Sequence, residues 1–258
     1  MTGAPNASTR AEVSAARQRA AAFVESEGDE VAIARARALI GTQPASVVVE
    51  LLRDVGSDSS LDQLLRMLGI LDDLRCSNAT PVERACESLS ARQQSDGSWS
   101  HPETASEDER IFSTGMIAGF LAKTPFVRQS TLASAADYLA ARWNPDRVKG
   151  SAWEATAAYF HCFALIRHEE SDAILQWCGR ELERGFLTGV YDAIRTARVF
   201  TLCKAHALPG SRLAAAELVA RILDDQMDDG GYASPENSSR CARISHTLDG
   251  LTALERLA

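Results

Sequence analysis

Two short segments of this 258-residue chain share the pattern Gln-x-x-Asp-Gly-x-aromatic, and this repeat constrains the fold more than any other feature of the sequence. The first copy runs from Gln93 to Trp99 and the second from Gln226 to Tyr232, an offset of 133 residues. That offset corresponds to three units of about 44 residues, a length typical of repeats made of helices. Each copy follows one stretch of helical apolar spacing and precedes another. The sequence therefore predicts helix pairs joined by a recurring turn.

The same period divides the chain into six pairs of predicted helices, and the class prediction is all-α. Asp29 and Ser60 are suitable N-caps, and Gly28, Gly41 and Gly56 are suitable helix stops. We expect a flexible N-terminus over 1–8 and a single domain over 9–258. The predicted pairs are 9–26 with 29–41, 44–55 with 59–75, 81–93 with 108–123, 130–143 with 151–167, 171–184 with 189–206, and 211–226 with 241–257.

The residues of the repeated turn have architectural roles. Gly accepts a positive φ without steric cost, so Asp-Gly suits a tight turn after a helix. The Gln side chain can hydrogen-bond carbonyl groups that the end of the preceding helix leaves open. The aromatic ring is expected to cover the gap to the neighbouring helix pair. The turn is thus interpreted as a structural device.

Composition supports the helical class and excludes several functions. The chain is 45% hydrophobic and 24% charged, with only 16 Gly and 8 Pro for β-turns. Its net charge is −8 and it has no cluster of basic residues, so nucleic acid is not an expected partner. The six cysteines form no CxxC pair, which argues against a zinc knuckle and a disulfide framework.

No signal-peptide pattern opens the sequence, and no window approaches the roughly 20 apolar residues that span a bilayer. We therefore expect a cytoplasmic protein without a membrane span. The sequence leaves its oligomeric state open.

The first turn, Gln93 to Trp99, resembles the QW motif of triterpene and diterpene cyclases. The stretch from Gly230 to Pro235, followed by 245–254, is similar to the last repeat of protein prenyltransferase β-subunits. The resemblance implies an (α/α)6 toroid, a double-layered ring in which the second helix of each pair faces a central cavity. Because one such fold hosts unrelated functions, the reaction must be argued from the site.

The working residues of these families are only partly present. Asp192 and His246 match two zinc ligands of the prenyltransferases, but Ile194 stands where the resemblance requires a cysteine thiolate. A zinc site needs about four ligands, so we expect no metal and no cofactor. In the class II cyclase pattern, Ile194 again replaces the key acid, and Arg195 would lower the pKa of Asp192. Asp192 and His246 remain the candidate catalytic residues.

Two acidic strings resemble the magnesium-binding motif of class I synthases. The string 224–228 fits Asp-Asp-x-x-Asp literally, but it straddles a helix end and the repeated turn, which places it on a rim. The string that begins with Asp72 and Asp73 fails at its last position and is interpreted as a solvated helix end.

Candidate substrate-binding residues come from the helices predicted to face the cavity. Arg195 and Arg198 on one helix, with Arg240 and Arg243 on the next, could grip a phosphate or carboxylate. Pairing with Asp192, Glu236 or Asp249 is the alternative.

Helix 151–167 carries aromatic and titratable groups that could line an apolar or cationic intermediate or form an aromatic core. These residues are Trp153, Glu154, Tyr159, Phe160 and His161.

The sequence thus favours a stand-alone terpenoid-cyclase-like or prenyltransferase-like enzyme of specialised biosynthesis. Its substrate would be an apolar isoprenoid or polyene, phosphorylated or carboxylated, and its reaction a cyclisation, isomerisation or elimination by an isomerase or lyase. The alternatives are a non-catalytic toroid that binds a lipid-like ligand or a protein, and a prenyltransferase β-like subunit.

Overall fold

The computed structural model describes residues 7–100, 105–235 and 239–258. Within these ranges the chain forms twelve α-helices, one 3₁₀ helix and no strand, which confirms the all-α prediction. The helices are α1 (Ala7–Glu27), α2 (Glu30–Leu39), α3 (Ala45–Leu51), α4 (Leu61–Asp73), α5 (Thr80–Arg92), α6 (Glu107–Leu121), α7 (Gln129–Ala141), η1 (Pro145–Val148), α8 (Trp153–Phe163), α9 (Ser171–Leu187), α10 (Ala193–Cys203), α11 (Ala215–Asp224) and α12 (Arg240–Leu257).

The predicted helices correspond one to one with α1–α12, and several predicted boundaries are confirmed. Asp29 caps α2 by accepting a hydrogen bond from the Ala32 N–H, and Ser60 begins α4 with a capping box. Gly41 follows α2 with a φ of 79°. Residues 1–6 of the expected flexible N-terminus lie outside the described residues, and α1 begins at Ala7.

Contacts between Cα atoms divide the chain into two compact units. Unit 1 contains α1, α2, α10, α11 and α12, and unit 2 contains α4 to α9 and η1. Their bounds are Met1–Val48, Asp192–Ala207 and Leu213–Ala258 for unit 1, and Val49–Tyr191 and Leu208–Arg212 for unit 2. The predicted closure of all six pairs into a toroid stays a prediction.

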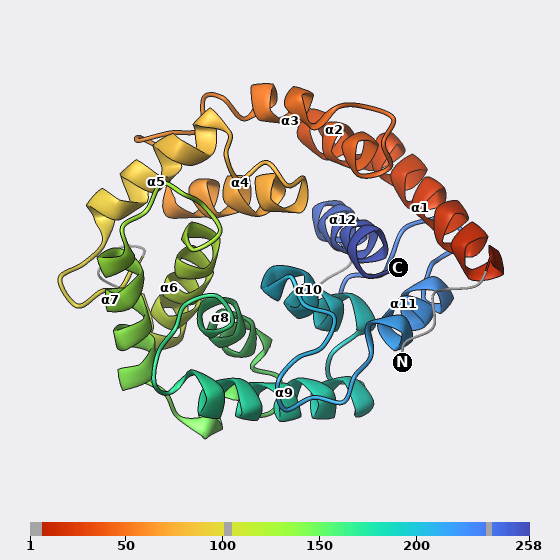
Figure 1. Ribbon diagram of the computed structural model, residues 1–258. Helices are drawn as coiled ribbons and strands as arrows, with labels where there is room; N and C mark the ends of the chain where they lie inside the picture. The colour runs from red at the N-terminus through yellow and green to blue at the C-terminus, as the bar shows by residue number, and fades with distance from the viewer. Residues whose placement is uncertain (1–6, 101–104, 236–238) are drawn as a thin grey trace. The chain divides into compact units, whose positions relative to one another are not determined.

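Small residues let two helices of unit 2 pack closely. α6 and α8 run beside each other (Figure 1). A Cβ atom at Gly115 would meet the backbone of Ala158, and one at Gly119 would meet the ring of His161. Only glycine at these two positions allows the observed approach, so α6 and α8 form the core of this unit.

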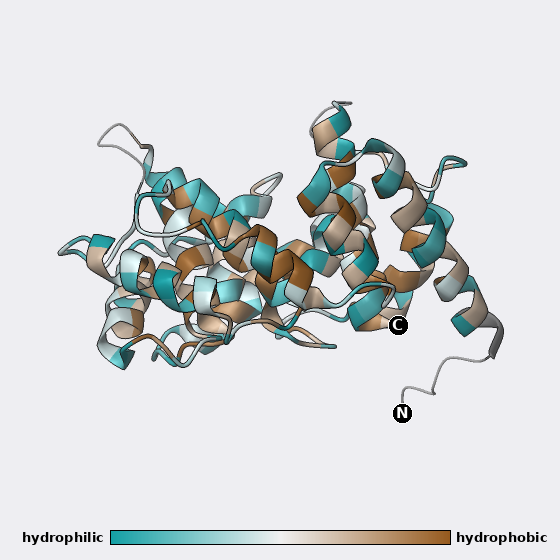
Figure 2. Cartoon of the chain, turned by 90° about the horizontal axis from the view of Figure 1, so that it is seen from above, coloured by the Kyte–Doolittle hydropathy of each residue, from teal (hydrophilic) through white to brown (hydrophobic). Residues whose placement is uncertain are grey.

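In unit 1, α12 contacts both α1 and α10 (Figure 1). Hydrophilic and hydrophobic residues alternate along the helices, as Figure 2 shows, which is the pattern of amphipathic helices that bury one face. Gly250 of α12 lies against Ile194 and Tyr232, where a Cβ atom would come within about 3 Å of both side chains. This glycine lets α10 approach α12.

The repeated turn uses its glutamine to bond to a helix other than the two that the turn connects. The Gln93 side-chain amide donates to the Gly97 carbonyl (3.0 Å) inside the turn and to the Thr131 carbonyl (2.9 Å) in α7. The expected contact with the end of the preceding helix is therefore wrong, because the side chain bonds inside its own turn and to α7. Gly97 has a φ of 87°, as the turn prediction requires.

The second copy repeats this geometry. The Gln226 amide donates to the Gly230 carbonyl (2.8 Å) and to the Ala16 carbonyl (2.9 Å) in α1. The φ of Gly230 is 86°. α1 therefore lies beside the second turn in the same way that α7 lies beside the first turn.

The aromatic residue that ends each turn is buried. The N–H of Trp99 donates to the Thr114 hydroxyl (3.0 Å), and the N–H of Tyr232 donates to the Thr247 hydroxyl (3.1 Å). The Trp99 indole N–H also donates to the Leu89 carbonyl (2.7 Å). The Tyr232 hydroxyl is buried and has no hydrogen-bond partner among the described residues. The two rings therefore occupy equivalent positions. The indole N–H of Trp99 has a hydrogen-bond partner, and the hydroxyl of Tyr232 has none among the described residues.

An ion pair ties each turn to the helix that follows it. Asp96 contacts Arg110 (2.9 Å), and Asp229 contacts Arg243 (2.8 Å). The hydrogen bond from Arg243, with one from the Gly231 N–H, lowers the pKa of Asp229 below its ordinary value of 3.8. All members of the second copy lie 133 residues after their equivalents, so the repeat extends beyond the short sequence pattern.

Because only the Trp99 ring is hydrogen-bonded, replacing Trp99 or Tyr232 by phenylalanine should affect the free energy of unfolding differently. Trp99→Phe removes a hydrogen bond and volume, so we expect a loss of about 2–4 kcal/mol in the free energy of unfolding. Tyr232→Phe removes only a buried unsatisfied hydroxyl, so stability should stay unchanged or rise by about 1 kcal/mol. Urea unfolding of both variants provides the measurement, and an equal loss in the two would contradict the assignment.

The Asp229–Arg243 pair predicts a pH-dependent contribution to stability. Because the pKa of Asp229 is lowered in the folded state, its contribution is complete above about pH 4 and is lost as the pH falls through the folded-state value. Asp229→Asn should therefore reduce the free energy of unfolding at pH 7, and its difference from the wild type should shrink at pH 3. Asp228→Asn is the control, and a difference that persists unchanged at pH 3 would argue against the pair.

Candidate active site

Asp192 is fixed at the start of α10 by its own backbone and side chain. It is the N-cap residue, and its Oδ1 accepts a hydrogen bond from the Arg195 N–H (2.7 Å). The Thr196 hydroxyl donates to the Asp192 carbonyl (2.8 Å). The bond from Arg195 occupies Oδ1 and leaves Oδ2 for another role.

His246 meets this second oxygen from α12. Its Nε2 lies 3.6 Å from Asp192 Oδ2, within ion-pair range but too long for a hydrogen bond. Asp192 Oδ2 is buried and accepts no hydrogen bond from any described residue. His246 itself is 9% exposed. The structure thus brings the two predicted catalytic residues together, with a short gap between them.

Asp249 extends the site along α12, one turn beyond His246 on the same face. Its Oδ1 lies 3.5 Å from Arg35 Nη2 of α2 and 4.0 Å from Arg198 Nε of α10. Together these five residues, Asp192, His246, Asp249, Arg35 and Arg198, form what we call the α10–α12 cluster.

The sequence analysis missed Arg35, although a signal was present. Its side chain is 9% exposed, and it belongs to a stripe of buried residues on α2. Ala32, Arg35, Ala36 and Leu39 recur at helical spacing, so an arginine in this stripe must extend its charge into the unit interior.

The remaining arginines divide between the cluster and the turn. Arg195 is half-buried in the first turn of α10, next to Asp192. Arg243 pairs with Asp229 and covers the Phe23 ring, 4.7 Å from its centroid, so it contributes to the repeated turn. Arg240 pairs with Glu27 (3.0 Å). Glu236, considered above as an arginine partner, lies outside the described residues.

The predicted aromatic residues of α8 belong to unit 2. Trp153 is half-buried and Glu154 is exposed. Tyr159, Phe160 and His161 are fully buried. These last three contribute to the packed core of the unit.

The contacts of two of them are specific. The Tyr159 hydroxyl donates to the Arg142 carbonyl (3.2 Å), and its ring meets Trp143 edge-on at 4.9 Å. The His161 ring lies edge-on to Phe120 at 4.6 Å. This geometry matches the alternative of an aromatic core.

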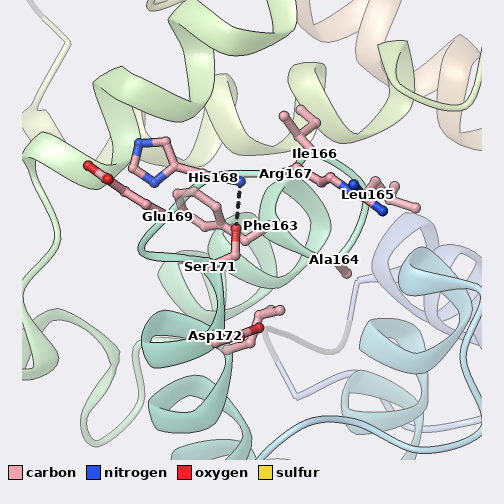
Figure 3. Close-up of a pocket in the computed structure, with 10 residues that line it drawn as sticks. Phe163, Ala164, Leu165, Ile166, Arg167, His168, Glu169, Ser171 and Asp172 are labelled. Atoms are coloured by element: carbon pink, nitrogen blue, oxygen red, sulfur yellow. Dashed lines mark hydrogen bonds between the residues drawn. The ribbon is translucent and has the colours of Figure 1, made fainter.

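A pocket of about 630 Å³ lies where α8 ends and α9 begins. Figure 3 shows the side chains of His168 and Arg167 pointing to opposite sides of it. His168 Nδ1 accepts from the Glu170 N–H (3.1 Å), and its Nε2 lies 3.4 Å from Asp137. A small-molecule site needs polar groups that converge, and this pocket does not provide them.

The two acidic strings have different environments. Asp224, Asp225 and Asp228 are exposed, as expected for a rim. Asp72 and Asp73, interpreted above as a solvated helix end, are instead buried. Asp72 has a buried counter-charge in Lys123, whose Nζ lies 2.6 Å from Asp72 Oδ2 with only 2% of its side chain exposed.

Among the described residues, no group of three or more His, Cys, Asp or Glu side chains is placed to hold a metal ion. The helices in the described ranges also include none that is long and apolar enough to cross a membrane.

The buried Lys123–Asp72 pair makes a stability prediction. Lys123→Met leaves a buried carboxylate without its counter-charge, so we expect a loss of about 3–5 kcal/mol. Adding Asp72→Leu should recover part of this loss. Lys149→Met breaks the exposed pair with Asp146 and should change stability by about 0.5 kcal/mol or less. Chemical denaturation measures all three variants, and equal losses from Lys123→Met and Lys149→Met would count against a buried pair.

Comparison of the chain with protein-family models, with curated proteins and with solved structures found no match.

Proposed function

We propose that this chain is a small-molecule enzyme in which Asp192 and His246 transfer a proton on an apolar isoprenoid or polyene substrate. The observation that carries the proposal is the buried Asp192 Oδ2, which faces His246 Nε2 at 3.6 Å and accepts no hydrogen bond from the described residues. An imidazole beside a fixed carboxylate can serve as a general acid or base.

The roles of the two residues differ. Asp192 is immobilised by its capping bond, so it provides a fixed negative charge that orients the His246 ring. His246, on the neighbouring helix, would give the proton to the substrate or take it away. Because the pair lies at a distance of 3.6 Å, a small shift of the imidazole completes a hydrogen bond.

This chemistry suits the reactions expected from the family resemblance. An isomerisation adds a proton at one carbon and removes one from another, and a single acid–base group can perform both steps. An elimination removes a proton as an anionic group leaves, and Arg35 and Arg198 provide positive charge at Asp249, one turn along α12 from His246. We further propose a cytoplasmic enzyme of specialised biosynthesis whose partner is its substrate.

The test is turnover of a substrate panel by the wild type and by matched variants. The panel consists of prenyl diphosphates of several lengths and the corresponding carboxylic acids, with products detected by mass spectrometry. Asp192→Asn keeps the helix cap but removes the charge, and His246→Gln removes the titrating ring. For a converted substrate, each should lower the rate about 10²- to 10⁴-fold with the melting temperature unchanged.

Asp29→Asn is the matched control because Asp29 caps α2 in the same way, through a hydrogen bond from the Ala32 N–H (2.8 Å). It should leave turnover at the wild-type level. Full turnover in both Asp192→Asn and His246→Gln would refute the proposed roles. Binding of panel members without any conversion would favour a non-catalytic lipid-binding protein.

A further inference from the structure

Asp249 is shared between two arginines from different helices. The same carboxylate oxygen, Oδ1, lies 3.5 Å from Arg35 Nη2 and 4.0 Å from Arg198 Nε. Charge-assisted hydrogen bonds between such groups are shorter, at about 2.7–2.9 Å. Asp249 is therefore held to both guanidinium groups by electrostatic attraction, without forming a close bidentate bond to either of them.

The three side chains also differ in their access to solvent. Those of Arg35 and Arg198 are 9% and 13% exposed, whereas that of Asp249 is 30% exposed. The two positive charges thus lie in the interior of unit 1, where electrostatic interactions are stronger than in water. Of the three side chains, the Asp249 carboxylate is the most accessible to a dissolved anion.

We propose that Asp249 is an internal counter-ion that competes with an oxyanion of the ligand for Arg35 and Arg198. The proposal rests on the proposed function for the identity of the ligand, since it assigns the anionic group of that substrate to the arginine pair. A phosphate or carboxylate has several oxygens and can contact guanidinium groups of both helices at shorter distances than Asp249 does. Asp249 would then select against weakly charged ligands, because only a sufficiently charged oxyanion displaces it.

His246 lies one turn before Asp249 on α12, so the bound oxyanion would be placed beside the Asp192–His246 pair. The reacting carbons of the substrate would thereby be held at a fixed distance from the proton-transferring imidazole. Asp249 acts through the arginines and is a positioning residue in this scheme.

The experiment measures the binding of inorganic pyrophosphate, inorganic phosphate and acetate to the full chain by calorimetry. Asp249→Asn removes the competing charge, so the affinity for pyrophosphate should rise about tenfold or more. Arg198→Gln should weaken pyrophosphate binding by a similar factor. If Asp249→Asn raises the affinity for pyrophosphate and phosphate more than the affinity for acetate, the ligand carries a phosphate. If it raises the affinity for acetate more, the ligand carries a carboxylate.

Glu255→Gln is the matched control. Glu255 is also an α12 carboxylate paired with an arginine from the N-terminal helices, Arg17, and its substitution changes the net charge by the same amount. It should leave the affinity for pyrophosphate within about twofold of the wild type.

Unchanged or weaker pyrophosphate binding by Asp249→Asn would overturn the proposal, and so would a failure of this variant to fold, since either result assigns the carboxylate to stability. These ions undergo no reaction at the Asp192–His246 pair. The binding result is therefore independent of turnover, and it distinguishes a failure of this inference from a failure of the proposed function.

Discussion

The hydrogen bonds of two glutamine side chains set the arrangement on which the rest of each unit depends. Gln93 and Gln226 each donate to a carbonyl inside their own turn and to a second carbonyl in another helix. One amide group thus fixes the turn and its distance to a second helix, which is α7 for Gln93 and α1 for Gln226. A glycine with positive φ follows in both turns, so the backbone passes close to that helix without a steric clash.

The candidate site inherits its geometry from this arrangement. The second turn, with Tyr232, directs the chain into α12, and Gly250 of α12 accommodates both Tyr232 and Ile194. That close approach brings His246 to Asp192 at the start of α10. Ile194, which stands where the prenyltransferase metal-binding pattern has a cysteine, therefore has a packing role between the two helices that carry the proposed catalytic pair.

Much of the fold was predictable because helices are encoded locally. The repeat period and apolar spacing located the twelve α-helices of the described residues, and Asp29 and Ser60 were recognised as caps because their side chains act on the backbone three residues away. Burial of charge was not predictable in this way. Asp72 is buried because Lys123, far along the chain, supplies the opposite charge, and no local pattern reports such a partner.

The residues of the candidate site were likewise predicted only in part. Asp192 and His246 came from a family resemblance, and the structure places them together. Arg243 was assigned to an anion site because it lies on a helix expected to face the cavity, yet its partner Asp229 lies in the repeated turn. Arg243 is recognised as part of the repeat only by comparison with the equivalent pair of Asp96 and Arg110. That equivalence becomes apparent when the two turns are compared in three dimensions.

The position of α1 has a consequence for synthesis of the chain. The carbonyl of Ala16 in α1 bonds to Gln226, 210 residues later. At a synthesis rate of 5–20 residues per second, α1 leaves the ribosome about 10–40 s before this partner exists. During that interval the apolar side chains of Val13, Phe23 and Val24, buried in the folded protein, have no access to α11 and α12. The nascent chain therefore carries apolar side chains of α1 that only α2 can cover until α11 and α12 emerge, and in this period they are exposed to aggregation and to chaperone binding.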